Sequence, residues 1–130
     1  MKFRAAALLV AVMLSPLYAL SAAAGYDSPL GLWRVADGSA VIRIKACGPE
    51  LCGYVAAAPP PRPGEKSAIG EKILMGMKRQ GNAWRGPIYD LNDGKVYGGE
   101  ISMRDNNHLN IRGCLSDTGV CGGETWKRVR

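Results

Sequence analysis

Four cysteines are the residues with the clearest chemistry in this chain of 130 residues. They lie in two closely spaced pairs, "CGPELC" with Cys47 and Cys52, and "CLSDTGVC" with Cys114 and Cys121. Zinc binding is disfavoured, because paired zinc ligands usually have about two to four residues between them and the second pair has six. A thiol redox site would need Cys-x-x-Cys beside a βαβ pattern, and neither occurs. We therefore predict disulfides and no metal site.

The pairing of these cysteines is suggested by the turns between them. Four cysteines allow three pairings, and the count alone selects none of them. Both pairs flank a segment rich in Gly, Pro, Asp or Ser, and residues on the two sides of a hairpin turn face each other with Cβ atoms about 4.5–5.5 Å apart, close to disulfide distance. We therefore predict the bonds Cys47–Cys52 and Cys114–Cys121. Their short loops limit the entropic stabilisation, so they should mainly fix hairpin register and resist proteolysis.

Candidate catalytic groups are few. His108 is the only histidine; we expect it on the surface beside a turn, and no nucleophile or carboxylate is tied to it by spacing. Asp90 and Asp93 could work as an acid–base pair, but they flank "DLNDG", where aspartates usually accept hydrogen bonds from the turn backbone. Gly98-Gly99 is no phosphate loop, because no helix follows it. We predict that the protein is not an enzyme and has no cofactor.

A group of aromatic residues and one arginine falls within a single predicted hairpin: Trp84, Arg85, Tyr89 and Tyr97. Aromatic rings give large contact areas at a low cost in conformational entropy, and a guanidinium adds a directed fork of donors. We predict that these four residues contact a ligand or partner. The alternative is that Trp84 and Tyr97 are core residues, since packing alone also explains their alternation.

The N-terminal segment has the pattern of a secretory signal. Lys2 and Arg4 precede the apolar run "AAALLVAVMLSPLYAL", which leads into the small residues "SAAAG". This order predicts a signal peptide over residues 1–24 and a single mature domain over 25–130. A retained anchor is the alternative, but a Ser-Pro pair interrupts the apolar run and leaves it short of the roughly 20 residues that span a bilayer. We expect a periplasmic or secreted protein without a membrane span in its mature form.

The mature sequence resembles a succession of short strands. The segment "PPPRPGEKSAIGE" is too rich in proline for a sheet and is expected to be a loop. The segment "KILMGMK" fits either a strand or a helical turn, and we interpret it as a strand. About eight strands with turns every eight to twelve residues indicate an all-β antiparallel barrel or sandwich. The predicted strands are "LWRVA", "AVIRIKA", "GYVAAA", "KILMGMK", "NAWRGPIY", "KVYGGEISM", "HLNIRGC" and "ETWKRV".

Alternation with a period of two assigns the faces of these strands. Residues predicted to point inward are Trp33, Val35, Ile42, Ile44, Val55, Trp84, Ile88, Tyr97, Ile101, Met103, Leu109, Ile111 and Trp126. Residues predicted to point outward are Arg34, Arg43, Lys45, Glu100, His108, Asn110, Arg112 and Lys127. Arg128 shares the inward face with Trp126, where an unpaired charge is costly. Because closure of a barrel brings the first and last strands together, we predict that Arg128 stacks on Trp33.

These residues carry a resemblance to a known family. Gly31-x-Trp33 together with Arg128 resembles the signature of lipocalins and calycins. Over nearly the whole mature chain the sequence is similar to a family of small exported bacterial proteins, domain of unknown function 2147. The similar segments are "GLWRVADGSAVIRI", "CGPELCGYV", "LNIRGCL…ETWKRV" and, most specifically, "GEKILMGMKRQGNAWRGPIYDLNDGKVYGGEI", where Trp84, Gly86, Ile88, Tyr89, Asp90, Gly94 and Tyr97 match in order.

The resemblance implies a lipocalin-like, up-and-down β-barrel of about eight strands, located in the cell envelope, with no established activity. Two features depart from the family pattern: the second cysteine pair, which most relatives lack, and the "PPPRPGEK" loop. The binding properties of the barrel rim therefore do not carry over from the family.

Charge narrows the range of partners. The chain has 17 Lys and Arg against 11 Asp and Glu, and the sequence after the signal segment, without Lys2 and Arg4, keeps 15 against 11. An exported basic domain rarely meets nucleic acid, so we do not expect that partner. Attraction to anionic envelope surfaces would be non-specific and sensitive to salt. A solvated basic surface is the simplest interpretation.

We therefore predict a non-enzymatic exported binding protein whose barrel holds a small apolar or amphipathic molecule at its mouth. Eight-stranded barrels either fill their interior with side chains or hold one small ligand, and the bulky inward set implies a shallow cavity. The alternative is a protein whose outer surface recognises an envelope protein or a cell-wall polymer, such as an inhibitor of a wall-degrading enzyme. The volume of the interior discriminates between the two.

Overall fold

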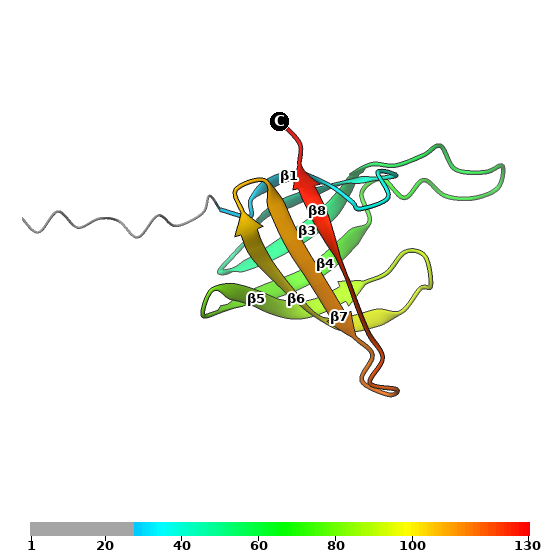
Figure 1. The fold of residues 1–130 in the computed structure, drawn as a ribbon. Coiled ribbons are helices and arrows are strands. Elements are labelled where there is room, and N and C mark those ends of the chain that lie inside the picture. The colour runs from blue at the N-terminus through cyan, green and yellow to red at the C-terminus, as the bar shows by residue number, and fades with distance from the viewer. Residues whose placement is uncertain (1–27) are drawn as a thin grey trace, which may run out of the picture.

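Eight antiparallel strands close into a barrel in the computed structural model, which describes residues 28–130 (Figure 1). The predicted signal peptide over residues 1–24 and its cleavage point lie outside the described residues. The strands are β1 (Gly31–Arg34), β2 (Val41–Cys47), β3 (Glu50–Ala57), β4 (Lys72–Gln80), β5 (Ala83–Tyr89), β6 (Val96–Asp105), β7 (His108–Cys114) and β8 (Cys121–Arg128).

Each strand pairs with its neighbour in sequence, and β8 pairs with β1 to complete the ring. The predicted barrel is confirmed, and so is the interpretation of "KILMGMK" as a strand, which lies within β4. Because neighbouring strands run in opposite directions, their connections gather at two ends. One end, which we call the mouth, has the longer connections (residues 35–40, 58–71, 90–95 and 115–120), and the opposite closed end has the two-residue turns 48–49, 81–82 and 106–107. The long 58–71 and 90–95 loops extend to the right in Figure 1.

The inward faces of the strands form one apolar core. Nine of the residues predicted to point inward are buried: Trp33, Ile42, Ile44, Val55, Ile88, Ile101, Leu109, Ile111 and Trp126. Leu74 and Met77 of β4 join them with no exposed surface. Val35, Trp84 and Met103, which lie nearer the ends of the barrel, are partly buried and pack against this core. Burial of such side chains removes apolar surface from water, which is the main force that holds a small barrel together.

Arg128 seals the closed end. Its guanidinium carbon lies 4.3 Å from the centroid of the Trp33 ring, as the alternation predicted. The same guanidinium donates to the carbonyl oxygens of Asn106 at 2.7 Å, Ser28 at 2.8 Å and Leu30 at 3.0 Å. One side chain therefore ties the last strand to the segment before β1 and to the β6–β7 turn.

The strand pairing that closes the ring, between β1 and β8, is short. Strand β1 has four residues and pairs with β8 only through Trp33↔Arg128 and Arg34↔Lys127. The predicted strand "LWRVA" ends earlier than expected, because the chain turns at Asp37-Gly38, where the Val35 N–H already donates to the Ala40 carbonyl. Over Cys121–Trp126, β8 therefore has β7 on one side, and on the other side no strand of the described residues 28–130 pairs with it.

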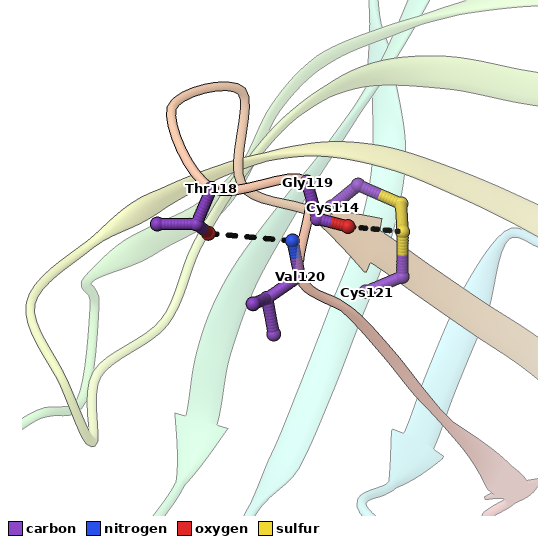
Figure 2. The surroundings of a disulfide bond; sticks show 5 residues. All are labelled: Cys114, Thr118, Gly119, Val120 and Cys121. Atoms are coloured by element: carbon purple, nitrogen blue, oxygen red, sulfur yellow. Dashed lines mark hydrogen bonds between the residues drawn. A yellow bond between two sulfur atoms is a disulfide. The ribbon is translucent and has the colours of Figure 1, made fainter.

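Both predicted disulfides are present. Cys114 and Cys121 lie directly opposite each other on β7 and β8, with Cα atoms 4.0 Å apart, and Figure 2 shows the bridge at the base of the 115–120 turn. Cys47 and Cys52 have Cα atoms 5.8 Å apart and are not opposite: Cys47 faces Glu50, whereas Cys52 faces Lys45. The first bridge therefore runs diagonally across its hairpin, because its turn has only two residues.

Candidate ligand site at the barrel mouth

A cavity of about 350 Å³ opens at the mouth of the barrel. Its floor consists of apolar side chains of the core, Ile42, Ile73, Ile88, Ile111 and Trp126. Its walls come from the β1–β2 and β5–β6 connections and from residues 122–124 of β8. The core below is filled, so the cavity is shallow, as the bulky inward residues predicted.

A row of glycines crosses four strands on the inward face and reaches the wall of this cavity. Gly86, Gly99, Gly113 and Gly122 lie directly opposite one another across β5, β6, β7 and β8. They share the inward face with Ile88 and Ile111, their neighbours two positions away, because strand side chains alternate between the faces. At Gly99 a built Cβ would lie 2.1 Å from Cδ1 of Ile88. The Ile88 side chain therefore occupies the space beside Gly99, whereas Gly122, where a built Cβ meets no atom within 4 Å, lines the cavity and leaves its wall open.

The charged side chains that line the cavity are acidic. They are Asp37, Asp90 and Glu124, and within residues 28–130 no lysine or arginine lines the cavity. Hydrogen bonds from the Ser39 hydroxyl and backbone N–H lower the pKa of Asp37. Exposed carboxyl groups are ionised at neutral pH. A chain that is basic overall therefore presents a negatively charged mouth.

Strand β8 directs Glu124 into the mouth. Glu124 lies opposite Ile111 and two residues before Trp126, both of which are buried in the core. Its carboxylate accepts a hydrogen bond from the indole Nε1 of Trp126, and its own side chain remains exposed. The carboxylate is therefore held at the margin between the apolar floor and water.

Tyr97 supplies a polar contact on the β5–β6 side of the mouth. Its hydroxyl donates to the Asp93 carboxylate. This hydrogen bond lowers the pKa of Asp93 and is the largest cause of the rise in the Tyr97 pKa to about 12. The ring of Tyr97 is thereby fixed against the wall of the cavity with its hydroxyl already used.

The four residues predicted to form the site are divided by the structure. Tyr89 and Tyr97 line the cavity. Trp84 lies at the other end of β5, packs against the core and is covered by the Arg79 guanidinium 5.2 Å from its ring. Arg85 points outward, and its Nε lies 2.8 Å from the carboxylate of Glu100. Five residues of extended strand separate Trp84 from Tyr89 by roughly 16 Å, so the two cannot contact one small ligand.

The family model described as an uncharacterized protein conserved in bacteria (DUF2147) matches residues 31–128, which include all eight strands. The chain belongs to this family. A solved structure, described as "Protein HP1028 from the human pathogen Helicobacter pylori belongs to the lipocalin family", is 17% identical and aligns over 79% of this chain and 84% of its own, with a TM-score of 0.65. That similarity shows a lipocalin-like fold. No curated protein matches the sequence.

The candidate catalytic residues of this DUF2147 protein, Asp90, Asp93 and His108, make local structural contacts. Asp90 and Asp93 accept the backbone N–H groups of Asn92 and Lys95, both at 2.8 Å, which is the predicted capping of the turn. His108 lies at the closed end with Nδ1 2.8 Å from the Asp105 carboxylate, and this contact is the largest cause of the lowered Asp105 pKa.

Within residues 28–130, no group of three or more His, Cys, Asp or Glu side chains is arranged to hold a metal ion. The same residues include no helix of the length and hydropathy that a membrane crossing requires.

Sequence reasoning missed Glu124, Asp37 and the glycine row. Counting back two residues from Trp126 places Glu124 on the inward face, so the signal for it was present in "ETWKRV". Asp37 belongs to the tight turn at Asp37-Gly38, and the sequence of a turn does not reveal which cavity its side chain lines. The glycine row depends on the register of four strands, which no single segment of the sequence reveals.

Proposed function

We propose that this protein is exported to the periplasm or secreted, and that it is a non-enzymatic binding protein that holds one small amphipathic molecule in the mouth of its barrel. The cavity carries the proposal: it combines an open mouth, a floor of core side chains and a volume of about 350 Å³, within the range of about 300–1,000 Å³ usual for ligand pockets. The signal-like N-terminus and the two disulfides support export, since disulfides persist in oxidising compartments.

The charges of the lining narrow the class of ligand. An apolar floor favours a hydrocarbon or aromatic body, and carboxylates at the rim favour a positively charged group on the same molecule. Asp37, Asp90 and Glu124 lie around the mouth, and the described part of the chain contributes no basic side chain to the lining. An anionic amphiphile would leave its charge beside three carboxylates, which is unfavourable at short range.

A second candidate function uses the outer surface. Arg43, Tyr54 and Lys72 lie side by side across β2, β3 and β4, and the Lys45 ammonium lies 4.8 Å from the centre of the Tyr54 ring. Such a basic patch with a central aromatic ring fits recognition of an anionic envelope polymer or protein. This candidate needs no cavity, so the two are separable by variants in the mouth.

A pair of amphiphiles with equal tails and opposite charges tests the first function. We expect octyltrimethylammonium to shift the fluorescence of Trp126 and to bind about tenfold more tightly than octyl sulfate, as one favourable charge contact would produce. Gly122→Leu should abolish binding of both, because a side chain there projects into the cavity and a built Cβ meets no atom within 4 Å.

Gly98→Leu is the matched control, because Gly98 lies opposite Cys114 on the outward face, where its Cβ would make only an ordinary contact at 3.8 Å. Binding that survives Gly122→Leu, or a preference for octyl sulfate, would contradict the proposal. Loss of octyltrimethylammonium binding on Glu124→Gln, with Trp33 emission unchanged, would place the cation at the mouth.

A further inference from the structure

The backbone of β8 presents unused hydrogen-bonding groups along one side. In an antiparallel sheet, successive residues direct their N–H and C=O groups alternately toward the two neighbouring strands. Two hydrogen bonds near the closed end show which residues of β8 face which side. The Arg128 N–H donates to the Asn107 carbonyl on the β7 side, and the Val129 N–H donates to the Leu32 carbonyl on the β1 side. Gly123 and Thr125 lie an even number of residues from Val129, so they also direct their backbone N–H and C=O groups away from β7.

On that side no backbone group of residues 28–130 forms a hydrogen bond with Gly123 or Thr125. Strand β1 pairs only with Lys127 and Arg128, and none of the turn and loop hydrogen bonds among residues 28–130 joins the β1–β2 connection to β8. We call residues 121–126, on the side away from β7, the β8 edge. Gly123 is exposed, and the edge contains no proline or lysine, the residues that commonly protect an open strand.

The β8 edge is held extended although no other strand of residues 28–130 pairs with it. Strand β7 pairs with it in register from Cys114↔Cys121 to Leu109↔Trp126. The disulfide joins the two strands at the base of the 115–120 turn. Within that turn the Thr118 hydroxyl accepts a hydrogen bond from the Val120 N–H at 3.3 Å (Figure 2). A strand that is already ordered loses little conformational entropy when another strand adds to it.

We propose that the β8 edge binds an extended peptide segment of a partner protein, which adds to the barrel as a further strand between β8 and the β1–β2 connection. Addition of a peptide to an open sheet edge is a recurrent mode of recognition, in which main-chain hydrogen bonds give affinity and alternate side chains give specificity. Gly123 and Thr125 would supply the main-chain bonds.

The inward side of the β8 edge specifies the peptide. Glu124 and Gly122 point inward and both line the cavity. A basic side chain opposite Glu124 would form an opposite-charge cross-strand pair. Opposite Gly122, which has no side chain, an apolar residue has room to reach the floor at Ile111. The partner segment is therefore one with a basic and an apolar residue two positions apart.

A second copy of the chain fits this edge less well. If two β8 edges paired antiparallel about Gly123, each Glu124 would lie opposite Gly122 of the other copy and would gain no basic partner. The two chains are also both basic, with more lysine and arginine than aspartate and glutamate. A peptide with its own basic side chain removes both disadvantages.

The test uses the folded protein and the peptide acetyl-Thr-Thr-Lys-Thr-Val-Thr-Thr-amide. We expect it to slow hydrogen exchange of the Gly123 and Thr125 amides at least about tenfold at saturation, since both amides would become hydrogen-bonded. N-methylation of the central Thr, whose N–H would face Gly123, should abolish binding, whereas N-methylation of the adjacent Lys or Val, whose N–H groups face away, should not.

Variants of the protein give an independent check. Thr125→Pro removes an N–H that β7 does not use, and we expect about fivefold to tenfold weaker peptide binding. Thr125→Val keeps the N–H and should bind like the wild type. Glu124→Gln should weaken this peptide but not its norleucine-for-lysine analogue. Should Thr125→Pro fail to fold, the N-methyl series decides alone.

Three outcomes would overturn the proposal. Binding that tolerates N-methylation at every position means that no strand is added. Unchanged exchange at Gly123 and Thr125 under saturating peptide means that the peptide binds elsewhere. Dimerisation in sedimentation experiments that Thr125→Pro abolishes identifies a second copy as the occupant. Binding of octyltrimethylammonium should be unaffected by Thr125→Pro, so failure of this proposal is distinguishable from failure of the cavity function.

Discussion

Arg128 and Glu124 are two charged residues on the inward face of the same strand, four positions apart. They differ in how far the fold itself satisfies their charges. Arg128 lies at the closed end, half-buried, with three carbonyl acceptors and the Trp33 ring around it. Glu124 lies at the mouth, exposed, with the Trp126 indole as its hydrogen-bond donor. The closed end satisfies its charge within the fold, whereas the mouth leaves a charge available to something else.

The largest expected effect is a loss of stability when the charge at the closed end is removed. Arg128→Ala should lower the free energy of unfolding by about 1–3 kcal/mol, because it removes the stacking on Trp33 and leaves three carbonyls without their donor. Glu124→Ala should change it by less than about 0.5 kcal/mol, as for most exposed substitutions. Urea unfolding of the two variants measures both. Equal losses would show that the mouth contributes to stability as much as the closed end does.

The two disulfides extend the comparison to the hairpins. Cys52 is almost completely buried, with 1% of its surface exposed, whereas Cys121 is exposed. Dithiothreitol should therefore open Cys114–Cys121 first, at a cost of about 2–3 kcal/mol in stability. Alkylation of the released thiols followed by peptide mapping gives the order. Prior release of Cys47 and Cys52 would show that the β2–β3 hairpin opens more readily than the β7–β8 hairpin.

The smallest effect concerns the β5–β6 side of the mouth. The hydrogen bond to Asp93 raises the Tyr97 pKa from its ordinary value of 10.0 to about 12. Because the folded-state pKa is raised, this contact is intact below pH 10 and is lost as the pH rises toward 12. Ultraviolet titration should show one tyrosine ionising late, and Asp93→Asn should return that tyrosine toward pH 10. A wild-type titration without a late tyrosine would place the Tyr97 hydroxyl in water.

The fold was predictable because its signals are local and repeated. Alternation alone placed Trp33, Ile42, Leu109 and Trp126 in the core, and it placed Arg128 where only a partner could satisfy it. The turn "DLNDG" behaved as its aspartates indicated, because an aspartate two residues from a backbone N–H needs no distant element to reach it.

The site was only partly predictable because it depends on register. Trp84 and Tyr89 are close in sequence, but an extended strand carries them to opposite ends of the barrel. Gly86, Gly99, Gly113 and Gly122 come from four strands and become one row only after those strands are aligned. The open side of β8 results from the length of a different strand, β1, which ends at Arg34.

The brevity of that closure also bears on how the molecule assembles. Seven of the eight strand pairings join neighbours in sequence, and the eighth joins Trp33 to Arg128. Local hairpins form quickly, whereas a contact across nearly the whole chain has to wait for loop closure. The ring can therefore shut only after β8 has been synthesised. Until then no closed barrel can form, and the Arg128 guanidinium that locks the ring is among the last groups to arrive.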